Sequence, residues 1–156
     1  AIYGNARELE KYPEKRGTEE HWNCTSTYDN SPIEYAKTMC EKEAWRINAK
    51  QTRWDMVVIN QATVVGPSIC SVIGTKAANI IKELCQETMK SEIPQIEIPF
   101  VDVRDVAQAH ISAAFSTDAH GRYILVGKKL RLREVAEVVN ETENSKIHLN
   151  TKEISS

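Results

Sequence analysis

Lys37 is the residue of this chain whose type and setting first suggest chemistry. It lies one turn into a segment with strong helix-forming signals, where a lysine and a tyrosine on one helix face can share a proton transfer. Residues four apart share a face, but the residue four before Lys37 is Ile33, which has no titratable atom. Tyr35 is two residues before it, and two helical steps turn its side chain by about 200° from Lys37. The spacing therefore leaves Lys37 without a tyrosine on its own face of the helix.

The helix that carries Lys37 is predicted over residues 32–50. Ser31 suits the N-cap, Pro32 suits the first helical position, and Glu34 completes an S-x-x-E capping box. Apolar side chains at helical spacing then form one stripe, which consists of Ile33, Ala36, Cys40, Ala44 and Ile47.

Strand and helix patterns alternate along the rest of the chain. Residues 5–30 are polar and turn-rich, which predicts a long loop, and residues 1–3 resemble the end of a strand. Apolar runs predict strands over 55–62 and 122–127, and apolar spacing predicts helices over 75–90, 102–116 and 131–141. Asp102 is the expected N-cap of the helix over 102–116. The basic run 128–133 is expected to be a solvated entry to the helix over 131–141, and the tail from 143 is polar. The alternation predicts an α/β fold with a mostly parallel sheet, in a single domain over 1–156.

Composition excludes several classes of function. A net charge of -2 over 156 residues gives no electrostatic reason to expect nucleic acid. No apolar run approaches the roughly 20 residues that span a bilayer, and no secretory leader is visible. We therefore expect a protein of the cytoplasm or the mitochondrial matrix that is not secreted. The cysteines, none of which has zinc-site spacing, are Cys24, Cys40, Cys70 and Cys85, so no metal is expected.

Six motifs in a fixed order carry a family resemblance. They are "AIYGN", "EEHWN", "KTMCEKEAW", "VVINQATVVGP", "FVDVRDVAQAHISA" and "GRYILVG", and they extend from Ala1 to about Glu141. In this order the chain resembles the extended short-chain dehydrogenases/reductases, in the branch of the dihydroflavonol and cinnamoyl-CoA reductases. The resemblance implies the C-terminal part of a Rossmann-like parallel sheet plus small substrate-lobe elements, without the N-terminal dinucleotide-binding half.

The resemblance also implies a set of site residues. Family members carry a Y-x-x-x-K pair, whose Tyr protonates the carbonyl oxygen and whose Lys binds the nicotinamide ribose. The KT-x-x-EK-x-AW pattern places the family's Lys at Lys37 and its Tyr at Ile33. In the family's N-P-x-x-V-x-G-P strand, Gln61 stands where the Pro would be. The resemblance thus implies no catalytic residue and a residual cofactor-binding set of Lys37, Asn60, Gln61 and Ala62.

The glycines of this chain form no G-x-G-x-x-G phosphate loop, so no cofactor is expected for the isolated chain. NADP(H) is expected only if an N-terminal half completes the chain. These features predict a catalytically inactive, reductase-like structural subunit of a larger assembly. The alternative is a segment of an NADP(H)-dependent carbonyl reductase. Contact with other protein subunits is expected through the 32–50 helix, with Tyr35, Met39 and Trp45 as anchors.

Overall fold

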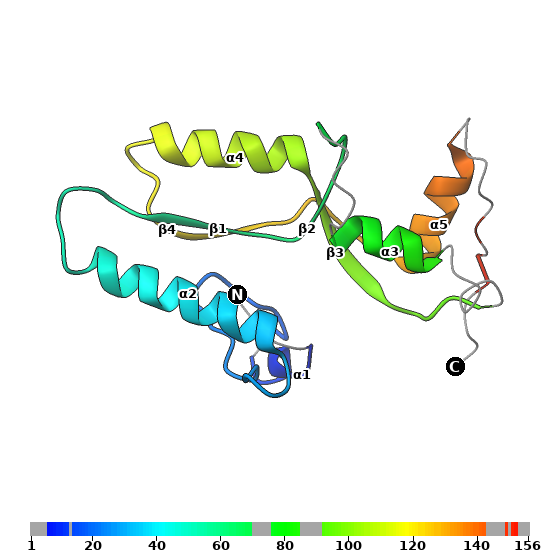
Figure 1. Cartoon of the computed structure of the whole chain (residues 1–156), viewed down its shortest axis with the longest axis horizontal. Coiled ribbons are helices and arrows are strands. Elements are labelled where there is room, and N and C mark those ends of the chain that lie inside the picture. Colours follow the sequence, from blue (N-terminus) through cyan, green and yellow to red (C-terminus); the bar gives the residue numbers. More distant parts are fainter. Residues whose placement is uncertain are drawn as a thin grey trace. The chain divides into compact units, whose positions relative to one another are not determined.

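The computed structural model describes residues 6–12, 14–69, 76–84, 92–142, 149 and 151–152. The predicted strand end at 1–3 and the predicted helical residues 75 and 85–90 lie outside this part of the chain. The helices and strands, in chain order, are α1 (Ala6–Leu9), α2 (Pro32–Asn48), β1 (Val57–Gln61), β2 (Thr63–Val65), α3 (Lys76–Leu84), β3 (Glu97–Asp102), α4 (Val103–Phe115), β4 (Gly121–Leu125), β5 (Lys128–Arg131) and α5 (Leu132–Glu141) (Figure 1).

The fold is α/β, as predicted, and it divides into two compact units. Unit 1 consists of Ala1–Asn60 and Ala109–Ile124, and unit 2 of Gln61–Gln108 and Leu125–Ser156. Each unit is described by itself, and the single domain expected over 1–156 stays a prediction. None of the described helices has both the length and the apolar character that crossing a membrane requires.

Helix α2 of unit 1 begins where the sequence predicts but is capped differently. Ser31 is the N-cap, and its carbonyl oxygen accepts the Tyr35 N–H at 2.9 Å. The Ser31 side chain makes no capping hydrogen bond, so the predicted capping box is wrong. The helix ends at Asn48 rather than at Lys50, because the last turn tightens: the Lys50 N–H donates to the Ile47 carbonyl, three residues back.

The apolar stripe of α2 lies on the outside of the helix. Ile33 is 71% exposed and Ile47 is 47% exposed. The buried residues of the helix are instead Thr38 and Glu41, with Tyr35 half-buried beside them. Unit 1 therefore packs a polar face of α2 inward and leaves an apolar face outward, the reverse of the usual arrangement for a helix in a globular protein.

Unit 2 is built on the three-stranded sheet β2-β3-β5. Strand β2 pairs with β3 in parallel and β5 pairs with β3 antiparallel, with Glu97 opposite Arg131. The expected solvated run before the last helix is thus the edge strand β5, and α5 begins at Leu132, one residue later than predicted. Helices α3 and α5 supply much of the core, which consists of Leu84, Ile93, Phe100, Leu132, Val135, Ala136 and Leu149.

The polar tail contributes to this core. Leu149 is 3% exposed, and Asn140 accepts its N–H at 2.7 Å and donates to its carbonyl at 2.8 Å. The Ile93 N–H donates to the Lys152 carbonyl at 2.7 Å. The two hydrogen bonds with Asn140 hold the backbone of Leu149 in place, so that its side chain packs in the core.

Helix α4 starts against a glycine that no other residue can replace without strain. Asp102 caps the helix as predicted, since its Oδ1 accepts the Arg104 N–H at 2.8 Å. The hydrogen bond from the Arg104 guanidinium, followed by that from its backbone N–H, lowers the pKa of Asp102 to about 2. Gly66 has φ +131, and a Cβ there would lie 2.7 Å from Cγ1 of Val103 in the first turn of α4.

We therefore expect Gly66→Ala to destabilise unit 2 through both backbone strain and collision. The strain alone is worth about 1 to 3 kcal/mol. Gly121 is the matched control, because its φ is +79 but a Cβ there would meet no atom within 4 Å beyond its chain neighbours. Thermal unfolding followed by circular dichroism should show the larger loss for Gly66→Ala. Equal losses for the two variants would show that the Val103 contact does not matter.

Candidate functional site

The candidate site residues of α2 lie on two different sides of the helix. Ile33 and Lys37 are both exposed, whereas Tyr35 is half-buried among the residues that face the interior of unit 1. A side chain at position 33 thus shares the solvent side with Lys37, and the hydroxyl of Tyr35 does not. That this helix carries no catalytic residue stays a prediction.

The other candidate residues follow one another at the end of β1. Asn60 is half-buried and belongs to unit 1, as does Lys37, whereas Gln61 and Ala62 belong to unit 2. Each is therefore placed only within its own unit. The Ala62 N–H donates to the Leu125 carbonyl at 2.9 Å, so that donor is already used inside unit 2.

The starts of helices α2, α4 and α5 do not fit the pyrophosphate of a dinucleotide. A pyrophosphate needs backbone N–H groups at a helix N-terminus. Helix α2 begins with Pro32, which has no N–H, the carboxylate of Asp102 occupies the start of α4, and that of Glu134 the start of α5. The starts of these three helices therefore offer no phosphate cradle.

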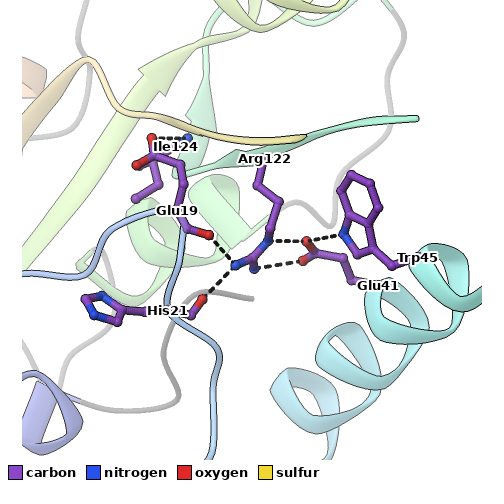
Figure 2. A network of polar contacts seen from close by, with 6 residues as sticks. All are labelled: Glu19, His21, Glu41, Trp45, Arg122 and Ile124. Carbon is purple, nitrogen blue, oxygen red and sulfur yellow. Dashed lines mark hydrogen bonds and ion pairs between the residues drawn. The ribbon is translucent and has the colours of Figure 1, made fainter. Parts of the chain in front are cut away.

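The best-built polar cluster of unit 1 centres on Arg122 of β4 (Figure 2). Its Nε donates to Oε1 of Glu41 at 2.5 Å and its Nη2 to Oε2 at 3.3 Å. Both side chains are only 8% exposed. Its Nη1 donates to the carbonyls of Glu19 at 2.6 Å and His21 at 2.7 Å. One guanidinium thus binds α2 and the loop 19–21 to β4.

Aromatic side chains complete this cluster. The Arg122 guanidinium lies 3.8 Å from the centre of the Trp22 ring, a cation–π contact. Trp45 donates from Nε1 to Oε1 of Glu41 at 3.4 Å, and the Ile124 N–H donates to Oε1 of Glu19 at 3.1 Å. These bonds satisfy the polar face of α2 and explain why that face points inward.

The electrostatics of the cluster make it sensitive to acid. Burial by itself raises the pKa of Glu41, but the hydrogen bond and charge of Arg122 act against it, and the net pKa is lowered. Because the folded-state pKa is lowered, the pair stabilises fully above the ordinary pKa of a glutamate. That stabilisation is lost as the pH falls through the lowered value. The cluster therefore acts as a structural clamp at neutral pH.

A second cluster in unit 1 surrounds Glu8, which is fully buried. The carboxylate accepts the Cys24 N–H and thiol, each at 2.7 Å, and the Thr25 hydroxyl at 3.0 Å. The bond to Glu8 is the main reason that the pKa of the Cys24 thiol is raised. A thiol that stays protonated is a poor nucleophile, so this cluster orders the loop rather than performing chemistry.

We also looked for a metal site and for a ligand-binding hollow in the described part of the chain, and neither is built there. Within that part, no three His, Cys, Asp or Glu side chains are grouped to hold a metal ion. A hollow of about 410 Å³ in unit 2 is lined by charged side chains, but Arg133 pairs with Glu137 at 2.8 Å and Arg131 with Glu97 at 3.6 Å. Its charges therefore largely satisfy one another.

Sequence reasoning missed the pair at the centre of the site. Glu41 and Arg122 both lie in motifs that carried the family resemblance, but 81 residues separate them, so no local pattern pairs them. The available signal was Arg122, the single charged residue of the motif GRYILVG.

Comparison with known proteins gives a consistent result. The model of the NAD dependent epimerase/dehydratase family matches residues 1–127. Cinnamoyl-CoA reductase CAD2 of Medicago truncatula is 36% identical over 106 residues, which are 68% of this chain and 31% of that protein. NADPH-dependent methylglyoxal reductase GRE2 of Saccharomyces cerevisiae is 26% identical over 155 residues, which are 90% of this chain and 44% of that protein.

Solved structures agree. The crystal structure of Gre2 from Candida albicans superposes with a TM-score of 0.72 at 26% identity, over 90% of this chain and 46% of that one. The same protein in complex with NADPH gives a TM-score of 0.71. The chain thus spans less than half the length of these relatives, and the predicted resemblance to the cinnamoyl-CoA reductase branch and the α/β class are confirmed.

The clamp yields a stability prediction. Arg122→Met should lower the free energy of unfolding of unit 1 by about 3 to 5 kcal/mol, because Glu41 keeps its buried charge without this partner. Urea unfolding followed by tryptophan fluorescence reports on this unit, since Trp22, Trp45 and Trp54 all belong to it. The double variant Glu41→Leu with Arg122→Met should recover part of the loss.

Arg46→Met is the matched control for the clamp. Arg46 pairs with Glu43 on the same helix at the same 2.5 Å, but the two side chains are 54% and 52% exposed. Water and salt screen such a pair, so its removal should change stability little. If Arg122→Met proves no more damaging than Arg46→Met, the clamp does not hold the unit together.

Proposed function

Because the chain belongs to the NAD-dependent epimerase/dehydratase family, we propose that it is a reductase-like polypeptide that does not itself reduce carbonyl compounds and serves as a structural subunit of a larger assembly. One observation carries the proposal: Ile33 occupies the position four residues before Lys37 on the exposed side of α2. Isoleucine can neither donate nor accept a proton.

The proton that carbonyl reduction requires is the reason that the residue at position 33 matters. When hydride reaches a carbonyl carbon, the oxygen gains negative charge and needs a proton from a group within hydrogen-bond reach. Lys37 is retained, but the hydroxyl that would share its side of the helix is missing. Tyr35 belongs to the half-buried residues of the opposite side, so its hydroxyl is a poor replacement.

The second candidate function is a segment of an NADP(H)-dependent carbonyl reductase. The relatives favour it, because they are named as cinnamoyl-CoA and methylglyoxal reductases and one of them as NADPH-dependent. In this case an N-terminal half would supply the phosphate cradle that the starts of α2, α4 and α5 lack. Both candidates share the expectation that this chain alone does not hold the cofactor.

Binding of NADPH by the chain alone is therefore expected to be weak. Titration calorimetry should show no saturable heat at sub-millimolar concentrations, because a pyrophosphate needs an open helix N-terminus, and Pro32, Asp102 and Glu134 occupy those of α2, α4 and α5. Candida albicans Gre2, whose NADPH complex is known, serves as the positive control. Micromolar binding by this chain would overturn the expectation.

Turnover separates the two candidates. We would join the N-terminal half of Saccharomyces cerevisiae GRE2 to this chain and compare Ile33 with Ile33→Tyr in methylglyoxal reduction, after NADPH binding has shown that the hybrid is folded. Restoring the proton donor should raise the rate about 100- to 10,000-fold. Tyr35→Phe, placed in both hybrids, is the matched control and should change neither rate.

Two results would decide against the inactive subunit. Reduction by the Ile33 hybrid at the rate of intact GRE2 would mean that another residue donates the proton. A large loss with Tyr35→Phe would identify that residue. Either result would favour the carbonyl reductase.

A further inference from the structure

One threonine of unit 1 follows two basic residues in an exposed loop. Lys15 and Arg16 lie three and two positions before Thr18, and all three residues are exposed. No other serine or threonine of the sequence has a lysine or an arginine at both of these positions. Protein kinases select their targets partly by charge, and two cations before a hydroxyl suit a kinase with an acidic substrate groove.

Thr18 begins a turn that is closed by a histidine. The Thr18 N–H donates to Nδ1 of His21 at 2.9 Å, and the His21 N–H donates to the Thr18 carbonyl at 3.1 Å. The Thr18 hydroxyl lies 3.2 Å from the same Nδ1. Because this ring nitrogen has one lone pair and the backbone N–H already points to it, the hydroxyl is a weakly held group at the surface.

Two other threonines of unit 1 show what distinguishes Thr18. Thr38 is buried, and its hydroxyl donates to the Glu34 carbonyl at 2.8 Å. Thr52 is exposed, but only one of the three residues before it is basic, namely Lys50. Thr18 combines an exposed hydroxyl with two basic residues at the positions that a kinase can read.

We propose that Thr18 is a phosphorylation site for a serine/threonine kinase that recognises Lys15 and Arg16. In the transfer, Oγ1 of Thr18 attacks the γ-phosphorus of ATP, and the bond from that phosphorus to the oxygen shared with the β-phosphate breaks. ADP leaves, and the hydroxyl proton passes to the aspartate base of the kinase. Residues 14–20 are exposed except for Gly17, which is half-buried, so the loop can open locally to reach the kinase.

The site lies directly before the loop 19–21, which the clamp holds (Figure 2). Nη1 of Arg122 binds the carbonyls of Glu19 and His21 at 2.6 and 2.7 Å, and Oε1 of Glu19 accepts the Ile124 N–H at 3.1 Å. A phosphate on Thr18 carries about −1.5 to −2 charges at neutral pH, and its oxygens are acceptors. It repels the carboxylate of Glu19 and competes for the guanidinium of Arg122. Phosphorylation therefore loosens the loop 19–21 and lowers the stability of unit 1, whichever of the two proposed functions holds.

Phosphorylation of the purified chain tests the site directly. The chain is incubated with Mg²⁺, ATP and the catalytic subunit of cAMP-dependent protein kinase, which prefers basic residues before its acceptor. Intact-mass and fragment mass spectrometry should show one phosphoryl group, on Thr18. Thr18→Ser should still accept the group because it keeps the hydroxyl, and Thr18→Ala should not.

Charge variants test how the site is recognised. Lys15→Gln with Arg16→Gln should slow phosphorylation at least about tenfold, because the kinase loses both cations. Thr52→Ala is the matched control and should leave the rate unchanged, since it removes an exposed threonine that follows a single lysine. The acid-directed casein kinase is the comparison, because the two residues after Thr18 are acidic. Faster transfer to Thr18 by that kinase would overturn recognition through the basic pair.

Unfolding in urea tests the effect on the clamp. The phosphorylated chain should unfold at a lower urea concentration than the unmodified chain, with Trp22 and Trp45 of unit 1 as fluorescent reporters. Thr18→Ala, treated with the kinase in the same way, is the control and should not change. An equal or higher midpoint after phosphorylation would show that the phosphate does not loosen the loop.

Three results would overturn the site itself. The first is phosphate on another residue while Thr18 stays unmodified. The second is phosphorylation of a synthetic peptide of residues 12–22 but not of the folded chain, which would mean that the turn does not open. The third is no phosphate on either. These readouts measure phosphate and unfolding, whereas the proposed function is tested by turnover, so either can fail without the other.

Discussion

The ion pair between Arg122 and Glu41 joins segments that are far apart in the sequence. A single guanidinium satisfies the carboxylate on α2 and two carbonyls of the loop 19–21, and it lies against Trp22. Two buried charges are costly unless they are paired, so this contact admits few alternatives. Once it forms, the rotation of α2 about its own axis is decided. Thr38 and Glu41 must point inward, and the opposite face must point to solvent.

That constraint also decides which residues of α2 are exposed. It presents Ile33 and Lys37 together on the exposed side, where a proton donor and its lysine would be needed for carbonyl chemistry. It also exposes the apolar stripe of α2, whereas a helix in a globular protein normally buries such a stripe. The isoleucine at position 33 offers no proton donor there and adds one residue to the apolar face.

Much of the fold could be predicted from local patterns. The start of α2 at Pro32, the Asp102 cap of α4 and the strand within 55–62 all follow from side-chain preferences within a few residues. Contacts over longer distances could not be predicted in this way. The run 128–131 became an edge strand because β3 lies beside it, and Leu149 became a core residue because Asn140 binds its backbone.

The sequence by itself determined the family, the α/β class and the absence of a proton donor four residues before Lys37, because each depends on residue types at short, fixed spacing. It also contained the apolar stripe of α2, but periodicity only says that one face is apolar, not which way that face points. Only the tertiary structure decided the direction. Arg122, 81 residues beyond Glu41, supplies a buried charge that must be neutralised, and this outweighs the tendency of the apolar face to turn inward.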